Sequence, residues 1–116
     1  REGLVGAVND KHGTGKEALL KDVTVAGKTG TAQVVSMKKF QETDEEDVAY
    51  KHKDHAWFTS FAPAENPEIA VTVLVEHGGH GGSAAAPIAK KILARYFAKK
   101  TELETNKAKE NQNVLQ

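Results

Sequence analysis

The sequence predicts an α+β fold in which a three-stranded antiparallel sheet packs against a C-terminal helix. Segments 23–35, 55–62 and 69–76 are rich in Val, Thr, Ala and aromatic residues, as strands are. The second and third segments are joined by a short turn and followed by a helical pattern, which favours an antiparallel sheet with helices packed on it. Residues 83–100 supply that pattern, with apolar side chains at helical spacing.

Composition limits the classes of protein that the chain can represent. Its 116 residues suffice for one small domain or part of one, and 16 basic residues balance 16 acidic ones. This balance gives no reason to expect nucleic acid or an anionic membrane as a partner. The absence of cysteine excludes disulfides, thiol catalysis and cysteine-based zinc sites. No apolar run approaches the roughly 18 residues that cross a bilayer, and because the first residue is Arg1 we expect a piece of a longer product.

The N-terminal part is expected to be a short helix followed by a turn and a long strand. Residues 1–9 carry apolar side chains at helical spacing, and turn residues follow over 9–15. One strand is predicted from Val23 to Val35. Gly27 and Gly30 inside this strand indicate a bulge or the close approach of a ligand to the backbone.

The second strand is predicted to have two different faces. It alternates Trp57, Thr59 and Phe61 on one face with Phe58 and Ser60 on the other. We expect the aromatic side chains of this strand and of the C-terminal helix to lie in the core: Trp57, Phe58, Phe61, Tyr96 and Phe97.

The third strand, residues 69–76, is apolar on both faces, which predicts that both faces are covered. A glycine-rich loop then leads to Ser83, the predicted N-cap of the helix, with Pro87 in the first turn. The helix is predicted to end near Lys100. Residues 101–116 have little to bury and are predicted to form a disordered polar tail.

The triplet Gly27-Lys28-Thr29 invites comparison with a phosphate-binding P-loop. A P-loop requires a glycine five residues before Gly-Lys-Thr, where this sequence has Asp22, whose carboxylate would repel phosphate. A P-loop also opens into a helix, whereas residues 32–35 continue as strand. We therefore set nucleotide binding aside.

Lys-Thr-Gly on a strand instead matches a signature of the active-site serine enzymes that recognise penicillin. Gly30 removes a side chain where a substrate must lie against the backbone. The hydroxyls of Thr29 and Thr31 can donate to a carboxylate, and Lys28 supplies the positive field that attracts it. The backbone N–H of Thr31 is suited to stabilise a developing oxyanion, and one such donor is worth about 3 kcal/mol in a transition state.

The surrounding sequence resembles class B penicillin-binding proteins. Residues 23–33 resemble their Lys-Thr-Gly strand, 55–63 the next strand, and 69–89 the final strand and helix. The loop 76–81 is most similar to that of the elongation (rod-shape) type. The resemblance covers about residues 1–100, and it implies the C-terminal part of a serine β-lactamase/penicillin-binding transpeptidase fold.

The resemblance also implies a function. The family is a serine acyltransferase that takes the penultimate D-alanine of a peptidoglycan stem peptide, expels the terminal D-alanine and forms a cross-link. It binds β-lactams in the same site, uses no cofactor, works with cell-elongation proteins and lies on the outer face of the bacterial inner membrane. Lys28 would assist proton movement, Thr29, Gly30 and Thr31 would bind substrate, and the Thr31 amide would complete the oxyanion hole.

The nucleophile of this family is not expected in the chain. No Ser-x-Asn occurs, and Ser36-Met37-Lys38-Lys39 fits Ser-x-x-Lys by letter but falls at the end of a strand rather than at a helix start. We therefore expect the chain alone to be inactive. The strand over 69–75 would present a long apolar edge, so we expect it to pair with the rest of its domain, to pair edge to edge with another copy, or to swap an element.

Two alternatives share the same strand: a sensor that binds β-lactam or peptide without turnover, and a D,D-carboxypeptidase or β-lactamase on the same fold. A metal site at His77 and His80, completed by His52 or His55, is a further alternative. Because no carboxylate partner is evident, we expect no metal there and a loop near the rim of the active site instead.

Overall fold

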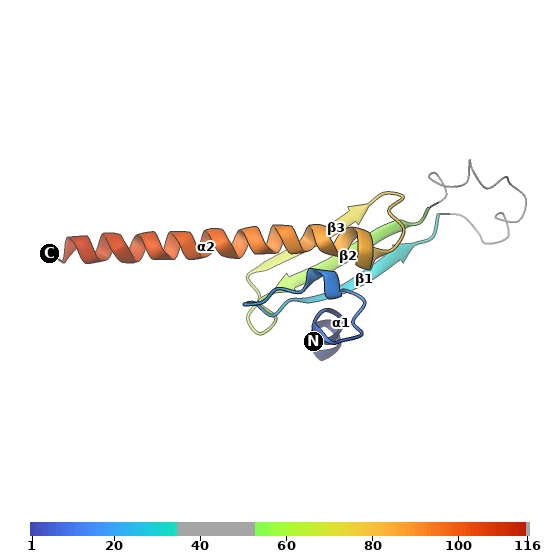
Figure 1. The fold of residues 1–116 in the computed structure, drawn as a ribbon, viewed down its shortest axis with the longest axis horizontal. Helices are drawn as coiled ribbons and strands as arrows, with labels where there is room; N and C mark the ends of the chain where they lie inside the picture. Colours follow the sequence, from blue (N-terminus) through green and yellow to red (C-terminus); the bar gives the residue numbers. More distant parts are fainter. Residues whose placement is uncertain (35–52, 116) are drawn as a thin grey trace, which may run out of the picture.

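The computed structural model describes residues 1–34 and 53–115. Its elements follow one another as helix α1 (Glu2–Asn9), the short 3-10 turn η1 (Lys16–Ala18), strands β1 (Ala26–Ala32), β2 (His55–Ala62) and β3 (Ile69–Val75), the π-type turn η3 (Gly81–Ala85), and helix α2 (Ala86–Val114). Figure 1 shows α2 lying along the sheet and extending well beyond it. The predicted α+β arrangement of three antiparallel strands and a C-terminal helix is confirmed.

The sheet has the order β1-β2-β3, with both pairs antiparallel. In the register, Lys28 lies opposite Thr59, which in turn lies opposite Thr72. Gly30 lies opposite Trp57, which is two residues before Thr59 in β2. Since β2 is central, β1 and β3 each keep one edge without a strand partner among the described residues. The strand that carries Lys-Thr-Gly is therefore an edge strand.

The core lies on the face of the sheet that the helices cover. Phe58 is fully buried there, together with Leu93 of α2, Val8 of α1 and Val25. Ser60 shares this face, and its hydroxyl donates to the carbonyl of Val71 at 3.1 Å, so the polar group is buried with a partner. The alternation of β2 thus places its even-numbered side chains in the core, as its sequence predicts.

The opposite face of the sheet, which we call the outer face, is left uncovered by residues 1–34 and 53–115. Trp57 is 39% exposed and Leu74, its cross-strand neighbour, is 44% exposed. The prediction that the aromatic residues all form core is therefore wrong for Trp57 and for Tyr96, which is 36% exposed. Phe58 is fully buried in the core, as predicted, whereas Phe61 and Phe97 are half-buried.

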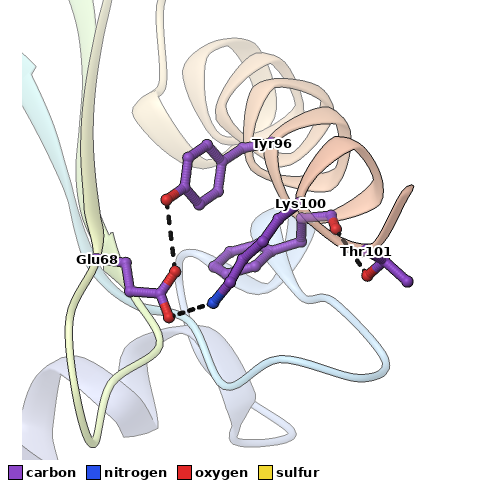
Figure 2. Close-up of polar contacts among 5 residues, drawn as sticks. Glu68, Tyr96, Lys100 and Thr101 are labelled. Atoms are coloured by element: carbon purple, nitrogen blue, oxygen red, sulfur yellow. Dashed lines mark hydrogen bonds and ion pairs between the residues drawn. The ribbon is translucent and has the colours of Figure 1, made fainter. Parts of the chain in front are cut away.

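Helix α2 is fixed to the sheet by polar contacts as well as by its apolar face (Figure 2). Glu68, just before β3, accepts a hydrogen bond from Tyr96 Oη at 3.4 Å and one from Lys100 Nζ at 2.5 Å. The hydrogen bond to Glu68 raises the pKa of Lys100 above its ordinary value, and the charge of the same carboxylate adds to this effect.

The helix does not end where the sequence predicts. The prediction of an end near Lys100 is wrong, because α2 continues to Val114. Residues 101–114 contain no Gly or Pro that would stop a helix. Every residue from 101 to 115 is exposed, in line with their lack of a buried face.

Two other predicted boundaries also shift. The first strand begins at Ala26 rather than Val23, because the backbone carbonyls of Thr24 and Val25 accept hydrogen bonds from outside the sheet, from Ala64 N and Asn9 Nδ2. Ser83 is not the N-cap of α2. It lies inside η3, which runs directly into α2 through a hydrogen bond from the Ala86 amide to the Gly81 carbonyl.

Candidate active site

The predicted site residues lie together on the edge strand β1. Lys28 and Thr31 are exposed, whereas Thr29 and Gly30 are half-buried. Strand alternation divides them between the two faces: Lys28 and Gly30 share the outer face, and Thr29 and Thr31 share the face that carries η3 and α2. A ligand that contacts all four residues must therefore lie along the edge of β1.

The free edge of β1 presents backbone groups as well as side chains. Lys28 Nζ donates to the carbonyl of Thr29 at 2.9 Å. In an antiparallel strand the N–H and C=O of one residue point to the same side, and this side alternates along the chain. The side chain of Lys28 reaches the Thr29 carbonyl, so this carbonyl points away from β2. The N–H groups of Thr29 and Thr31 then point away from β2 as well, because they lie on the same side of the strand. The Thr31 N–H is then available at the edge, as an oxyanion donor must be.

Turn η3 lies directly behind this edge and requires glycine at two positions. A Cβ at Gly81 would lie 2.1 Å from the Trp57 carbonyl oxygen and 3.1 Å from the Gly30 nitrogen. A Cβ at Gly82 would lie 2.4 Å from the Thr14 carbonyl oxygen. The glycine-rich loop thus seats η3 against the backbone of β1 and β2, a close approach that the sequence alone did not reveal.

The start of β1 is held by the N-terminal segment. Asn9 Nδ2 donates to the carbonyls of both Val5 and Val25, each at 2.8 Å, and so joins α1 to the residue before β1. The turn after α1 brings Thr14 beside the strand, where Thr29 Oγ1 donates to Thr14 Oγ1 at 3.1 Å. In the sequence Thr14 stands out only as the centre of a Gly-Thr-Gly turn, which gives no sign of its contact with Thr29.

His77 of the β3–η3 loop contacts His55 of β2 and the backbone of Lys53. The backbone N–H of His77 donates to His55 Nδ1 at 2.9 Å, and the two rings lie 4.7 Å apart. His77 Nδ1 also lies 3.1 Å from the Lys53 carbonyl oxygen. Within residues 1–34 and 53–115, no three His, Asp or Glu side chains are grouped as metal ligands would be. His52 lies outside the described residues.

The two serines that the structure describes both donate to backbone carbonyls. Ser60 is buried and bonded to Val71, and the Ser83 hydroxyl donates to the His80 carbonyl at 3.3 Å inside η3. The Ser36-Met37-Lys38-Lys39 match lies outside the described residues. The described site therefore has a positive side chain, hydroxyl donors and an edge amide, which suit binding of a carboxylate and an oxyanion.

Comparison with known proteins identifies the class. Residues 1–94 match the penicillin binding protein transpeptidase domain, and the chain belongs to this family. Among curated proteins it is similar to the peptidoglycan D,D-transpeptidase MrdA of Haemophilus influenzae, with 42% identity over 98 residues that cover 84% of this chain and 15% of the relative. It is also similar to MrdA of Escherichia coli, with 33% identity over 94 residues that cover 80% of this chain and 15% of the relative.

Solved structures agree with this assignment. The penicillin-binding protein PBP2 of Helicobacter pylori, in a complex with MreC, matches with a TM-score of 0.63 and 35% identity, covering 82% of this chain and 16% of that one. PBP2 of Pseudomonas aeruginosa, in complex with WCK 5153, matches with a TM-score of 0.62 and 36% identity, covering 82% and 18%. The resemblance to elongation-type class B penicillin-binding proteins is confirmed, and the chain spans 15–18% of the length of these relatives.

Proposed function

We propose that this chain supplies one wall of the active site of a peptidoglycan D,D-transpeptidase. The observation that carries the proposal is the Lys28–Thr31 segment on an edge strand, in a chain whose family is that of the transpeptidase domain. Lys28 provides positive charge at this edge, and Thr29 and Thr31 provide hydroxyl donors. These groups suit the terminal carboxylate of a stem peptide, or the carboxylate of a β-lactam.

The proposed chemistry is acyl transfer through a serine that lies outside this chain. The serine oxygen attacks the penultimate D-alanine carbonyl, and the negative charge that develops on the carbonyl oxygen is stabilised by the Thr31 N–H. The terminal D-alanine leaves as the tetrahedral intermediate collapses, and its nitrogen takes up the proton that the serine hydroxyl has lost. The acyl group then passes from the serine oxygen to an amine of a second stem peptide, and the proton of that amine returns to the serine. Lys28 holds a positive charge beside the site and assists movement of the proton from the serine.

Labelling with a fluorescent penicillin tests this function. The longer protein that carries this sequence should be labelled covalently, the 116-residue chain alone should not, and Lys28→Ala should lower the labelling rate at least about a hundredfold. Lys91→Ala, which changes an exposed lysine of α2, is the matched control and should leave the rate unchanged. No labelling of the longer protein contradicts the proposal.

The acyl acceptor separates transpeptidase from the other functions that share this strand. Cross-linked products from stem-peptide substrates support transpeptidase. Release of D-alanine without cross-links identifies a carboxypeptidase, hydrolysis of the β-lactam itself identifies a β-lactamase, and stable labelling without release identifies a sensor.

We further propose that the free edge of β3 pairs with the remainder of the transpeptidase domain. Ala70, Thr72 and Leu74 are exposed on the outer face, and the edge of β3 has no strand partner among the described residues. An uncovered apolar edge promotes association. The isolated chain should self-associate when its mass is measured by light scattering after size exclusion, and a monodisperse folded monomer contradicts this proposal.

The relatives suggest a cellular location and a protein partner. Its relatives are peptidoglycan transpeptidases, and one solved relative is in complex with MreC. We propose that the protein associates with a cell-elongation protein and acts on the extracytoplasmic side of the bacterial inner membrane. In residues 1–34 and 53–115, no helix has the length and apolarity needed to cross a bilayer.

A further inference from the structure

The turn between α1 and η1 places a second hydroxyl beside the Lys-Thr-Gly strand. Thr29 Oγ1 and Thr14 Oγ1 are 3.1 Å apart, although the two residues are 15 positions apart in the sequence. Thr29 is one of the two hydroxyl donors proposed above for the ligand carboxylate. A side chain that contacts its oxygen directly therefore affects how that donor is presented.

Backbone packing fixes the position of Thr14. The amide of Gly15 donates to the Ala7 carbonyl at 2.8 Å, which anchors the turn to α1. On the other side, Gly82 of η3 packs so closely that a Cβ there would lie 2.4 Å from the Thr14 carbonyl oxygen. Thr14 is thus held between α1 and η3, and it offers Thr29 a hydrogen-bond partner in a fixed place.

Each of the two hydroxyls can donate only one hydrogen bond, which limits how Thr29 can bind a carboxylate. Each hydroxyl has one proton and can accept as well. In the structure the Thr29 O–H donates its hydrogen bond to Thr14 Oγ1, so Thr29 cannot donate to a carboxylate at the same time. If Thr29 turns its O–H to the carboxylate, its oxygen keeps a partner only when Thr14 turns its own O–H towards Thr29.

We propose that Thr14 is a positioning residue for carboxylate recognition. When a carboxylate binds, the hydrogen bond between the hydroxyls reverses, and a chain runs from Thr14 through Thr29 to the carboxylate. No proton is transferred, since both O–H bonds only rotate. Hydrogen bonds in such a chain polarise and strengthen one another, so Thr14 favours ligands that carry the negative charge. This proposal rests on the proposed function.

The test compares two ligands in the longer protein that carries this sequence: penicillin G, with its free carboxylate, and penicillin G methyl ester, which lacks the charge. Thr14→Val keeps the shape of the side chain and removes the hydroxyl. We expect it to lower the acylation rate constant for penicillin G roughly three- to tenfold, the effect of one hydrogen bond, and to leave the slower rate for the ester within about twofold. Thr14→Ser restores the hydroxyl and should restore the rate for penicillin G.

A control uses a second pair of threonines in the same sheet. Thr59 Oγ1 and Thr72 Oγ1 lie 3.2 Å apart on the outer face, so Thr72→Val makes the same chemical change away from Thr29. It should leave the ratio of the two acylation rates unchanged. Circular dichroism melting of each variant establishes that it is folded.

The outcomes separate this inference from the proposed function. If Thr14→Val slows both ligands equally, or slows neither, Thr14 is a structural contact and the inference is wrong, while acylation of the wild type still supports the function. If Thr14→Ser fails to restore the rate, the hydroxyl is not what matters and the inference is also wrong. If the wild type is not acylated at all, the proposed function itself fails.

Discussion

The two faces of the sheet differ in how complete they are. On the helix-covered face, Phe58 is fully buried, the Ser60 hydroxyl is bonded to a carbonyl, and α1, η3 and α2 all pack on the strands. On the outer face, Trp57 is 39% exposed and Leu74 is 44% exposed. The same strands supply both faces, so the difference lies in what covers them. The helix-covered face is a finished core, and the outer face is a surface suited to the rest of a larger domain.

The largest expected effect comes from truncating one aromatic residue on each face. Phe58→Ala removes a fully buried ring and should lower the free energy of unfolding by about 3–5 kcal/mol. Trp57→Ala removes a partly exposed ring and should lower it by less than about 1.5 kcal/mol in the 116-residue chain, because much of its area stays in water. Urea unfolding followed by circular dichroism measures both. Equal losses would show that the two faces do not differ.

A smaller effect is expected where η3 meets the back of β1. Gly81→Ala places a Cβ 2.1 Å from the backbone oxygen of Trp57, and relief of this overlap should cost about 1–3 kcal/mol of stability. Gly3→Ala in α1 is the matched control, since nothing lies within 4 Å of its Cβ, and it should stabilise the helix by about 0.5–1 kcal/mol. If Gly81→Ala is tolerated as well as Gly3→Ala, η3 does not pack as described.

The smallest effect concerns the Lys100–Glu68 contact, which lies at the rim of the helix-covered face (Figure 2). The pKa of Lys100 is raised in the folded chain by its hydrogen bond to Glu68, so the charged form is favoured there. Its stabilising effect is complete below the ordinary lysine pKa of 10.5 and is lost as the pH rises past the raised value.

Melting temperatures measured from pH 9 upward test this contact, with Glu68→Gln as the comparison variant. The gap between wild type and variant should be largest below the ordinary lysine pKa of 10.5 and should shrink as Lys100 loses its proton. Because both side chains are partly exposed, at 40% and 29%, the gap should be small throughout. A gap that does not change with pH would show that the charge of Lys100 plays no part.

The sequence predicts the sheet well because strand periodicity is local. The alternation in β2 separates Phe58 from Trp57, and Lys-Thr-Gly is recognisable in the sequence as a strand signature. The position of this strand at the edge of the sheet came from the structure. Burial could not be predicted in the same way, because the alternation shows that Trp57 and Phe58 face opposite sides but not which side the helices cover.

The contacts behind the site are not local, and the sequence gives little sign of them. Thr14 meets Thr29 across 15 residues, and Gly81 meets Trp57 across 24. In the sequence the first contact shows only as turn residues over 9–15, and the second only as a glycine-rich loop after the third strand. Both contacts involve a glycine of η3, Gly82 beside Thr14 and Gly81 beside Trp57, where the two backbones lie too close for a side chain. The partner of each glycine could be named only once the strands were placed in space.

We propose that this chain binds the ligand while the nucleophilic serine lies outside residues 1–116. Peptide mapping by mass spectrometry, after penicillin G has acylated the longer protein, tests it most directly. We predict that the penicilloyl adduct lies on a serine outside residues 1–116, and that Lys28→Ala reduces its amount sharply at short times. An adduct on Ser36, Ser60 or Ser83 of this chain would show that the nucleophile lies within it and would overturn the proposal.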